Sequence, residues 1–568
     1  MAGSLSYVYT NCRKSFCSNK IKFGKRFRRN SQKITTASAK VLPCTDYRER
    51  STFKDKWHEI APLRQRKKRT MKEIQLIIVL CLGLVGCNRS LQITQQSTAI
   101  PLYDIVLQNG RIIDPASQID TILNIGIQAD TIAIISEEVL NGKQIIDATN
   151  LVVAPGFIDL HSHTPTPLGQ WFQLQDGVTT ALDLEAGAFP QSGYGEFLQD
   201  GAWINYGASV GYFAIRIKVM EGKDEPYIFS PKGAIHPQVA FTQKATPEQI
   251  NKMSALLHKG LEEGGIGIGL LLDYMDQAIS PAELEMIFEV SAQYKAPIWV
   301  HIRRGVQGDP AGLEEMISLS RDYRASVHIC HLQANAMGQI ASWLERIDEA
   351  NRYGGADISV EMYPYTAGST SISADVFDRD WQNIFGITYE DVQWSDTGEY
   401  LTKETWEKYR KEQPTGAIIH HYGKEEWNRI SLKHPQVMIA SDAMPVISRN
   451  RKVTPRGNGT FSKILGKYVR EEQLMTLPEA IAKMTYLPAR RLEKIAPIFS
   501  KKGRLSVGAH ADIVIFDPVK IQDHGTYENP YQPSTGLHYV LIGGRFVMEQ
   551  EKVLNDTFLG RHLSLKIR

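Results

Sequence analysis

The sequence predicts an α/β fold, a (β/α)8 TIM-type barrel joined to a small β-sandwich domain. Strand-like apolar segments alternate with helix-like segments over residues 154–499, as in parallel sheets with crossover helices. A closed barrel accommodates the eight strand segments more economically than an open sheet does. Short alternating segments at residues 103–153 and 500–555 flank this region. They predict one small β domain assembled from both ends of the chain.

Local signals define the elements of the barrel region. Thr246 and Pro247 predict the start of a helix that runs to Leu261, because threonine caps helices and proline suits their first turn. The other predicted helices are residues 281–295, 311–323 and 339–353, and the predicted strands are residues 151–154, 178–184, 202–210, 266–271, 297–300, 325–330, 357–363 and 437–440. Residues 371–415, rich in Trp, Tyr and charge, break the alternation and predict an insertion.

Glycine-containing turns predict hairpins in the flanking β segments. Asn109-Gly110 separates two apolar runs near the start, and Gly543-Gly544 separates two near the end. Both dipeptides are typical of two-residue β-hairpin turns.

The first 70 residues differ in charge from the rest of the chain. They contain 19 Lys and Arg against 4 Asp and Glu, although the whole chain carries a formal net charge of only +3. The basic excess therefore does not indicate a nucleic-acid partner for the main body. A basic arm is one interpretation of residues 1–70. We favour a non-native, disordered extension upstream of a true start at Met71.

Residues 71–87 form the pattern of a bacterial lipoprotein signal peptide. A charged start precedes the apolar run 74–86 and then Cys87, and the run is too short to span a bilayer comfortably. Leu84-Val85-Gly86-Cys87 resembles a lipobox, whose cysteine is lipidated after cleavage. We therefore expect a lipid anchor at Cys87, a tether over residues 88–102, and location on the extracytoplasmic side of a bacterial cell envelope. The alternative is an internal apolar helix that ends in Gly-Cys.

His161 and His163 are the clearest chemical signal. They follow an apolar strand-like run at a spacing of two, so both imidazoles project to the same side. Two neutral imidazoles that converge in this way hold divalent metals. Taken alone, the pair also fits ordinary loop histidines.

Three later residues share this position at a strand end. His301, His331 and Asp442 each stand where a predicted strand stops. The carboxyl ends of barrel strands converge on one mouth, where active sites lie. We therefore expect all of these residues to meet at one metal site.

At this point the chain resembles the amidohydrolase superfamily, and within it the N-acyl-D-amino-acid deacylase (D-aminoacylase) branch. The resemblance covers about Tyr103 to Val547. Its motifs are Pro155-Gly-Phe-Ile-Asp-Leu-His-Ser-His163, Gly177-Val-Thr-Thr180, Tyr363-Pro-Tyr-Thr-Ala-Gly-Ser-Thr370, Ile439-Ala-Ser-Asp442, a run from Gly459 to Glu471, and Gly508-Ala-His-Ala-Asp-Ile-Val-Ile-Phe-Asp-Pro518.

The resemblance implies a role for each of these residues. It places His161 and His163 on the more buried metal, His301 and His331 on a second one, and Asp442 on metal and proton transfer. The implied cofactor is Zn2+, as one or two ions, with other divalent metals open. An open position on zinc lowers the pKa of its water to about 7, and an aspartate in this place acts as general acid and base.

The bridging ligand departs from the pattern of the branch, which uses a cysteine just after the second strand. This chain has none there, and Glu185 lies at or one place before the equivalent position. A carboxylate bridges hard divalent ions, so Glu185 is our candidate. Asp183 becomes the ligand if the register differs by one pleat, and Lys218 is a weaker candidate for carboxylation.

The substrate-binding residues are altered as well. Gln333 replaces a lysine that the family often has two places after His331. Arg456, in Thr-Pro-Arg, is the best candidate for the substrate carboxylate, because a guanidinium binds carboxylates bidentately. Its rivals are Arg449 and Arg451, and the remaining candidates are Arg303, Tyr363 and, less distinctly, Tyr365.

These observations predict a metal-dependent hydrolase that cleaves a C–N amide bond of a small molecule, foremost an N-acyl-D-amino acid. Another amide remains as an alternative, whether an isoaspartyl-like dipeptide, a cyclic imide or a lactam. A non-catalytic binding protein of amidohydrolase type is the alternative of another class.

Overall fold

The computed structural model describes residues 101–230, 233–234 and 239–565. The predicted upstream extension, signal peptide and lipidated Cys87 lie outside the described residues, as does all but the end of the predicted tether. Within the described residues, no helix is both long enough and apolar enough to cross a membrane.

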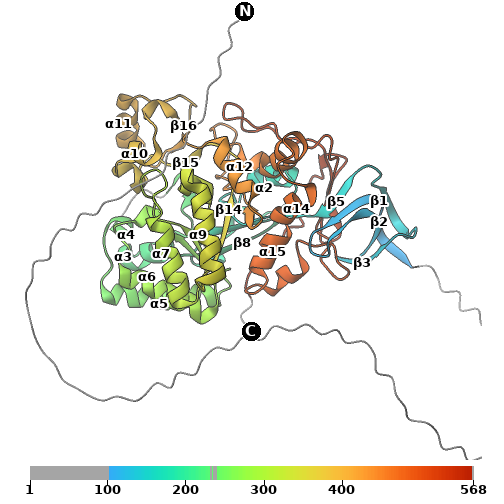
Figure 1. Cartoon of the computed structure of the whole chain (residues 1–568), viewed down its shortest axis with the longest axis horizontal. Coiled ribbons are helices and arrows are strands. Elements are labelled where there is room, and N and C mark those ends of the chain that lie inside the picture. Colours follow the sequence, from blue (N-terminus) through green and yellow to red (C-terminus); the bar gives the residue numbers. More distant parts are fainter. Residues whose placement is uncertain (1–100, 231–232, 235–238, 566–568) are drawn as a thin grey trace, which may run out of the picture. The chain divides into compact units, whose positions relative to one another are not determined.

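Eight parallel strands form the centre of the molecule (Figure 1). In sheet order they are β18 (Val437–Ile439), β14 (Asp357–Met362), β13 (Ser326–Ile329), β12 (Ile298–His301), β11 (Ile268–Leu271), β8 (Asn205–Gly211), β7 (Val178–Ala188) and β6 (Phe157–Asp159). The two outer strands meet through a parallel bridge between Ser162 and Ala443, where the His163 amide donates to the Ala443 carbonyl at 2.9 Å. The predicted (β/α)8 barrel is confirmed.

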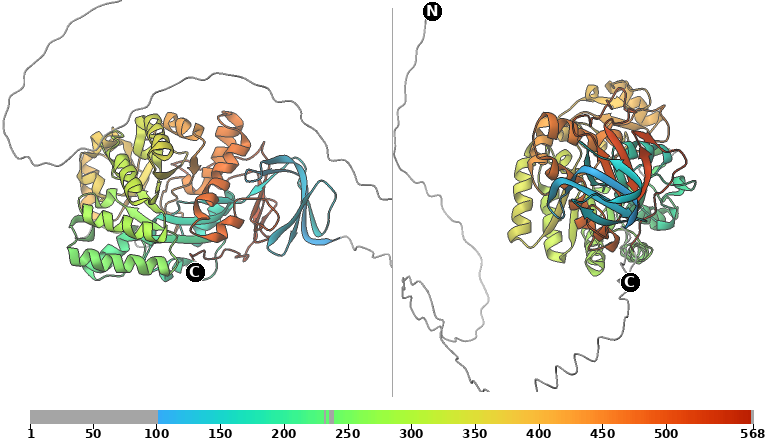
Figure 2. Two further views of the ribbon diagram at one scale, coloured as in Figure 1. Left: turned by 60° about the horizontal axis from the view of Figure 1, so that its bottom comes forward. Right: turned by 90° about the vertical axis from the view of Figure 1, so that its right-hand side faces the viewer.

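Helices surround the strands (Figure 2). The helices in chain order are α2 (Pro167–Gln175), α3 (Tyr212–Glu221), α4 (Val239–Thr242), α5 (Pro247–Glu262), α6 (Pro281–Tyr294), α7 (Ala311–Tyr323), α8 (Leu332–Ala336), α9 (Ile340–Tyr353), α12 (Glu425–Lys433), α13 (Arg456–Lys463), α14 (Leu477–Met484) and α15 (Tyr486–Leu492). Helix α5 shows why these segments are helical. Thr246 and Gln249 form a reciprocal capping box at its start, and Met253, Leu257 and Leu261 bury one stripe at a spacing of four.

The first strand of the barrel differs from the prediction. The apolar run 151–154 supplies β5 (Val152–Pro155), which belongs to the other large sheet. The barrel strand before the histidine pair is instead β6. The chain changes sheets at Gly156, where a side chain would collide with Thr179. An apolar run alone does not say in which sheet it is buried, so the sequence did not distinguish the two strands.

The small β domain is one sheet of nine strands drawn from both ends of the chain. Its path is β22 (Lys552–Val553), β21 (Arg545–Glu549), β20 (Leu537–Ile542), β19 (Ile513–Phe516), β5, β1 (Leu102–Asp114), β2 (Ile119–Gln128) and β3 (Thr131–Ser136), with β4 (Asn141–Asp147) also paired to β1. Strand β5 lies between β19 and β1. The two segments that flank the barrel are therefore joined by backbone hydrogen bonds.

One of the two predicted hairpins is present and the other is wrong. Gly543 and Gly544 connect β20 to β21, and both have positive φ, 53° and 70°. Asn109 and Gly110 instead lie inside β1, where the register with β2 shifts at a bulge. Asn109 has φ of 59°, and a left-handed residue serves a bulge as well as a turn.

A small antiparallel sheet spans the predicted insertion at 371–415, with one strand inside it and the other two at its boundaries. Strand β17 (Ala417–His420) pairs with β15 (Gly368–Ser371) on one side and with β16 (Val392–Trp394) on the other. Helices α10 (Trp381–Phe385) and α11 (Lys403–Glu412) complete it. A two-stranded ribbon, β9 (Phe229–Ser230) and β10 (Gly233–Ala234), precedes α4.

A buried ion pair joins two helices of the barrel. Arg216 of α3 contacts Glu283 of α6, and both side chains are fully buried. Tyr212 also donates a hydrogen bond to Glu283 at 2.8 Å.

Removing the cation from this pair is expected to destabilise the barrel. Arg216→Met leaves the Glu283 carboxylate buried without its counter-ion, so the free energy of unfolding should fall by about 3–5 kcal/mol. Urea denaturation measures the change. The control is Lys252→Met, which breaks an exposed pair with Glu248 and should leave the free energy of unfolding almost unchanged. Equal effects of the two substitutions would contradict this assignment.

Candidate metal centre

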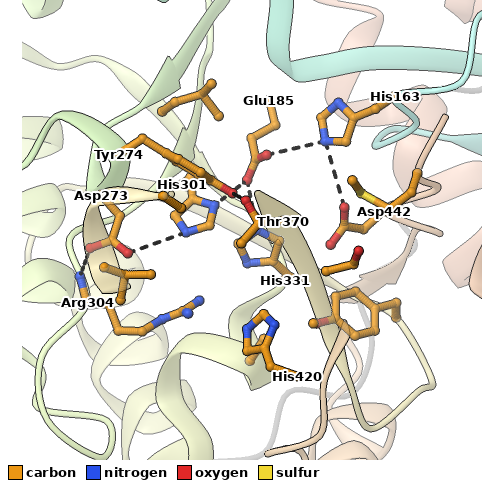
Figure 3. A pocket seen from close by; sticks show the side chains of 18 of the residues that line it. His163, Glu185, Asp273, Tyr274, His301, Arg304, His331, Thr370, His420 and Asp442 are labelled. Atoms are coloured by element: carbon orange, nitrogen blue, oxygen red, sulfur yellow. Dashed lines mark hydrogen bonds and ion pairs between the residues drawn. The ribbon is translucent and has the colours of Figure 1, made fainter. Parts of the chain in front are cut away.

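The mouth of the barrel gathers the side chains at the strand ends (Figure 3). Strand β7 contributes Glu185 directly, and β12 ends at His301. His161 and His163 follow β6, His331 follows β13, and Asp442 follows β18. All six are buried, with exposed fractions of 8% or less. Residues from five strands therefore face one pocket.

His161 and His163 present their Nε2 atoms to each other, 3.0 Å apart. The Nδ1 atom of each ring is held from behind by a carboxylate. Glu361 lies 2.9 Å from Nδ1 of His161, and Asp183 lies 3.1 Å from Nδ1 of His163. Carboxylates in this position fix the orientation of metal-binding imidazoles and raise their basicity.

Glu185 stands between the two histidine pairs. Its Oε2 lies 3.2 Å from Nε2 of His161 and 3.5 Å from Nε2 of His163. Its Oε1 lies 3.1 Å from Nδ1 of His301 and 2.8 Å from Nε2 of His331. Each pair therefore faces one oxygen of the same carboxylate, which is the arrangement of a bridging ligand.

The charge of Glu185 is set by these neighbours. Burial raises the pKa of Glu185, but His161, His331 and His301 outweigh it and hold that pKa well below its ordinary value. The carboxylate is therefore ionised and ready to bind a cation.

The two other candidates for the bridge lie elsewhere. Asp183 accepts from the Gly187 amide at 3.2 Å and holds the far side of His163. Lys218 lies on α3, partly exposed, and pairs with Asp224 at 2.5 Å. The structure therefore gives Asp183 a supporting position and places Lys218 outside the site.

Asp442 faces the first histidine pair with one oxygen. Its Oδ1 lies 3.5 Å from Nε2 of His161 and 3.7 Å from Nε2 of His163. Its Oδ2 is bound by Nη2 of Arg456 at 2.8 Å. The backbone of Asp442 is left-handed, with φ of 49°, a conformation that aspartate tolerates better than most residues.

The donor chemistry fits a metal. His161, Glu185 and His331 form one group whose ligand atoms lie within 4.8 Å of one another, and His161, His163 and Asp442 form another. Imidazole nitrogen and carboxylate oxygen together are the ligands of zinc and related divalent ions. Two adjacent groups with Glu185 between them can hold two ions.

Three of the residues predicted to bind substrate do not line the pocket. Gln333 donates to the Tyr363 carbonyl at 2.8 Å, and Arg303 pairs with Asp276 and Glu315. Arg456 is only 1% exposed and holds Asp442. Each side chain is thus occupied by protein partners. The rival arginines are also engaged, Arg449 over the rings of Trp171 and Phe172, and Arg451 with Asp396.

Of the tyrosines, Tyr363 lines the pocket and Tyr365 does not. The hydroxyl of Tyr365 donates to Asp523 at 3.3 Å. The guanidinium carbon of Arg456 lies over the ring of Tyr363, 4.5 Å from the ring centroid.

Sequence reasoning missed several residues of the pocket. Arg304, Asp273, Tyr274 and His420 all line it (Figure 3). Asp273 follows β11 by two residues, so its position after a strand was a usable signal. His420 ends a strand of the insertion, for which the sequence offers no motif.

Arg304 lines the pocket, whereas Arg303, the residue predicted to bind substrate, does not. Side chains alternate only while the backbone is extended, and β12 ends at His301. Arg303 therefore does not share the side of His301, and Arg304 reaches the pocket instead.

Comparison with known proteins gives a family and several relatives. A model of the amidohydrolase family matches residues 419–548. An N-acyl-D-glutamate deacylase of Alcaligenes xylosoxydans xylosoxydans is 28% identical over 488 residues, which cover 79% of this chain and 94% of the relative. A D-aminoacylase of the same organism is 28% identical over 509 residues, 82% of this chain and 98% of the relative.

A crystal structure of a deacylase is also similar to this chain. N-acyl-D-glutamate deacylase from Bordetella bronchiseptica, complexed with zinc and a phosphonate inhibitor, aligns with a TM-score of 0.66 and 25% identity. The alignment covers 82% of this chain and 100% of that one. These similarities confirm the resemblance that the motifs indicated.

The three candidates for the bridge are separated by metal analysis. Glu185→Ala should lose at least one equivalent of bound zinc relative to the unsubstituted protein, because both histidine pairs face its oxygens. Asp183→Asn should keep the stoichiometry but weaken affinity by about 10–100-fold. Lys218→Met serves as the control and should change neither. Elemental analysis after dialysis at graded zinc concentrations measures both quantities, and loss of zinc from Lys218→Met would refute the assignment.

Proposed function

Because this chain belongs to the amidohydrolase family, we propose that it is a metal-dependent hydrolase that cleaves the amide bond of N-acyl-D-amino acids. The observation that carries the proposal is Glu185 between two histidine pairs, with Asp442 beside them. The deacylases to which the chain is similar support the substrate class, since their alignments extend over most of its length.

The residues that would hold zinc are those at the strand ends. They are His161, His163, Glu185, His301, His331 and Asp442. When bound, zinc supplies Lewis acidity, which polarises a carbonyl oxygen and lowers the pKa of water to about 7.

Asp442 is placed to move the proton at its Oδ1 atom. Arg456 occupies Oδ2, so Oδ1 is the oxygen that faces the histidine pair. Oδ1 accepts a proton from the attacking water and returns it to the amide nitrogen, as a general base and then a general acid. The bond between the carbonyl carbon and the nitrogen breaks, and the products are a carboxylate and a free amine.

Arg456 positions the general base. Its Nε donates to the main-chain carbonyl of Asp442 at 2.5 Å and its Nη1 to the Ala367 carbonyl at 3.1 Å. The guanidinium therefore holds both the backbone and the carboxylate of Asp442, which lies on a left-handed residue after β18. Such fixing of a catalytic group reduces the reorganisation that the reaction needs.

Replacing the general base is expected to stop turnover while zinc stays bound. Asp442→Asn keeps the shape of the side chain but removes its basicity, so kcat for N-acetyl-D-methionine should fall by about 10²–10⁴-fold. Acetate release measures the rate, and elemental analysis measures zinc in the same samples.

The control for this substitution is Asp322→Asn, an exposed aspartate on α7, which should leave kcat unchanged. N-acetyl-L-methionine tests the stereochemical part of the proposal and should be hydrolysed more slowly. Zinc-loaded protein that hydrolyses neither enantiomer, nor any other N-acyl amino acid, would overturn the proposed function.

We also propose that the protein is anchored by lipid at Cys87 on the extracytoplasmic side of a bacterial envelope. The support is the pattern of a charged start, an apolar run and Gly86-Cys87. The acidic main body, in contrast to residues 1–70, suggests no nucleic-acid partner.

The anchor is tested by expression of the chain in a bacterial host with a labelled fatty acid. Cys87→Ser should abolish the label and release the protein from the membrane fraction. Cys81→Ser, inside the same apolar run, is the matched control and should leave both unchanged. Mass spectrometry of the native N-terminus should begin at a modified Cys87, and a mature protein that retains residues 1–70 would contradict the proposal.

A further inference from the structure

We propose that Arg304 binds the α-carboxylate of the substrate and restricts the enzyme to N-acyl amino acids with uncharged side chains. The inference rests on the proposed function and adds to it a residue and a substrate class. It follows from how Arg304 is held, from its lack of a salt bridge to any described carboxylate, and from the other residues that line the pocket.

The backbone holds Arg304 at the mouth of the barrel. Its main-chain amide donates to Oδ1 of Asp273 at 2.8 Å, and Asp273 also lies 3.7 Å from Nε2 of His301. From this point the side chain runs into the pocket toward His331 and His420 (Figure 3). A residue outside the strands is therefore fixed relative to the metal ligands.

The guanidinium is oriented, and Asp273 interacts with it through space without forming a salt bridge. Its Nη2 donates to Oδ1 of Asn335 at 2.7 Å, and its carbon lies 5.0 Å from the ring centroid of Phe385 and 5.9 Å from that of Tyr422. Its Nε is buried without a hydrogen-bond partner. Among the described residues no carboxylate forms a salt bridge with Arg304. A buried cation with an unused donor is costly unless an anion pairs with it.

The neighbouring arginines are already paired, which leaves Arg304 as the anion site. Arg303 binds Asp276 and Glu315. Arg379 binds Asp273 at 2.7 Å, and Arg456 binds Asp442. Of the lysines and arginines among the described residues, only Arg304 lines this pocket.

The position of Arg304 suits a carboxylate close to the reacting amide. Asn335 contacts Arg304 with its oxygen and lies with its nitrogen 3.2 Å from Nδ1 of His331. An anion on Arg304 is therefore next to the second histidine pair. In an N-acyl amino acid a single carbon separates the carboxylate from the amide nitrogen, so the two groups lie close together, as do Arg304 and His331 on either side of Asn335.

The same pocket disfavours a second negative charge. Besides Arg304 and the histidines, the ionisable lining includes the acidic residues Glu185, Asp273 and Asp442. Once Arg304 pairs with the α-carboxylate, an aspartate or glutamate side chain of the substrate finds no further lysine or arginine. The apolar lining residues are Ile228, Leu271, Ala334, Ala374, Val376, Phe385 and Met444. This lining suits side chains such as those of methionine and leucine.

The experiment compares Arg304→Met with the zinc-loaded unsubstituted protein on three substrates. For N-acetyl-D-methionine, kcat/KM should fall by about 100-fold, mainly through KM, since a buried charge partner is lost. For N-acetyl-D-methioninamide, which lacks the carboxylate, kcat/KM should change less than about threefold. The unsubstituted protein should prefer N-acetyl-D-methionine to N-acetyl-D-glutamate by about 100-fold.

Arg303→Met is the matched control, because Arg303 is the adjacent arginine and does not line the pocket. Arg303→Met should keep the ratio of kcat/KM between the carboxylate and the carboxamide substrate. Zinc content is measured for both variants. A general structural defect would lower kcat/KM for the carboxylate and the carboxamide substrate together. Loss of a carboxylate-binding residue changes the ratio of the two values.

Two results would overturn the inference. One is an unchanged ratio in Arg304→Met, and the other is N-acetyl-D-glutamate as good a substrate as N-acetyl-D-methionine. If the unsubstituted protein hydrolyses no N-acyl amino acid, the proposed function fails separately. Calorimetric binding of N-acetyl-D-methionine then tests the role of Arg304 separately. Tenfold weaker binding to Arg304→Met supports carboxylate binding by Arg304, and equal affinity overturns it.

Discussion

The Glu185 carboxylate, buried among four imidazoles, is the interaction on which the architecture of the site depends. Its two oxygens lie within 3.5 Å of nitrogen atoms from both histidine pairs. A buried carboxylate is stable only where positive charge or donors surround it. Strands β6, β7, β12 and β13 must therefore keep their relative heights, because a shift of one residue turns each side chain to the other face.

Asp159 shows how the closure of the barrel is tied to this site. Its Oδ1 accepts from the main-chain amides of His161 at 3.2 Å and of Ser441 at 3.0 Å. Its Oδ2 accepts from Gln173 at 3.2 Å. Burial raises the pKa of Asp159 to about 6, although the hydrogen bonds from Ser441 oppose that rise. One carboxylate thus joins the end of the first strand to the end of the last, and sets the place of Asp442 relative to the histidine pair.

The predictable part of the site is the set of histidines and the aspartate that end apolar strand segments or closely follow them. His301 and His331 follow apolar runs whose direction and length are visible in the sequence, so their convergence follows from the barrel. Arg304 was not predictable in the same way, because it lies beyond the end of β12, where alternation no longer holds. His420 ends β17, just after the predicted insertion, and the position of β17 depends on its pairing with β15, much earlier in the chain. The sequence pattern contains no local trace of such pairing.

Arg456 and Arg304 hold different positions in the site, and the position of the first bears on the proposed role of the second. A guanidinium bound to Asp442, the proposed general base, leaves Oδ1 as its one oxygen that faces the histidines, and this arrangement needs Arg456 to be buried. An arginine held in this way faces Asp442 and the Ala367 carbonyl and does not line the pocket. In the proposed reaction the carboxylate of the substrate must then meet another cation. Of the described arginines, Arg304 lines the pocket, and its buried Nε lacks a hydrogen-bond partner. Because Asp442 engages Arg456, the proposed binding of the substrate carboxylate is left to Arg304.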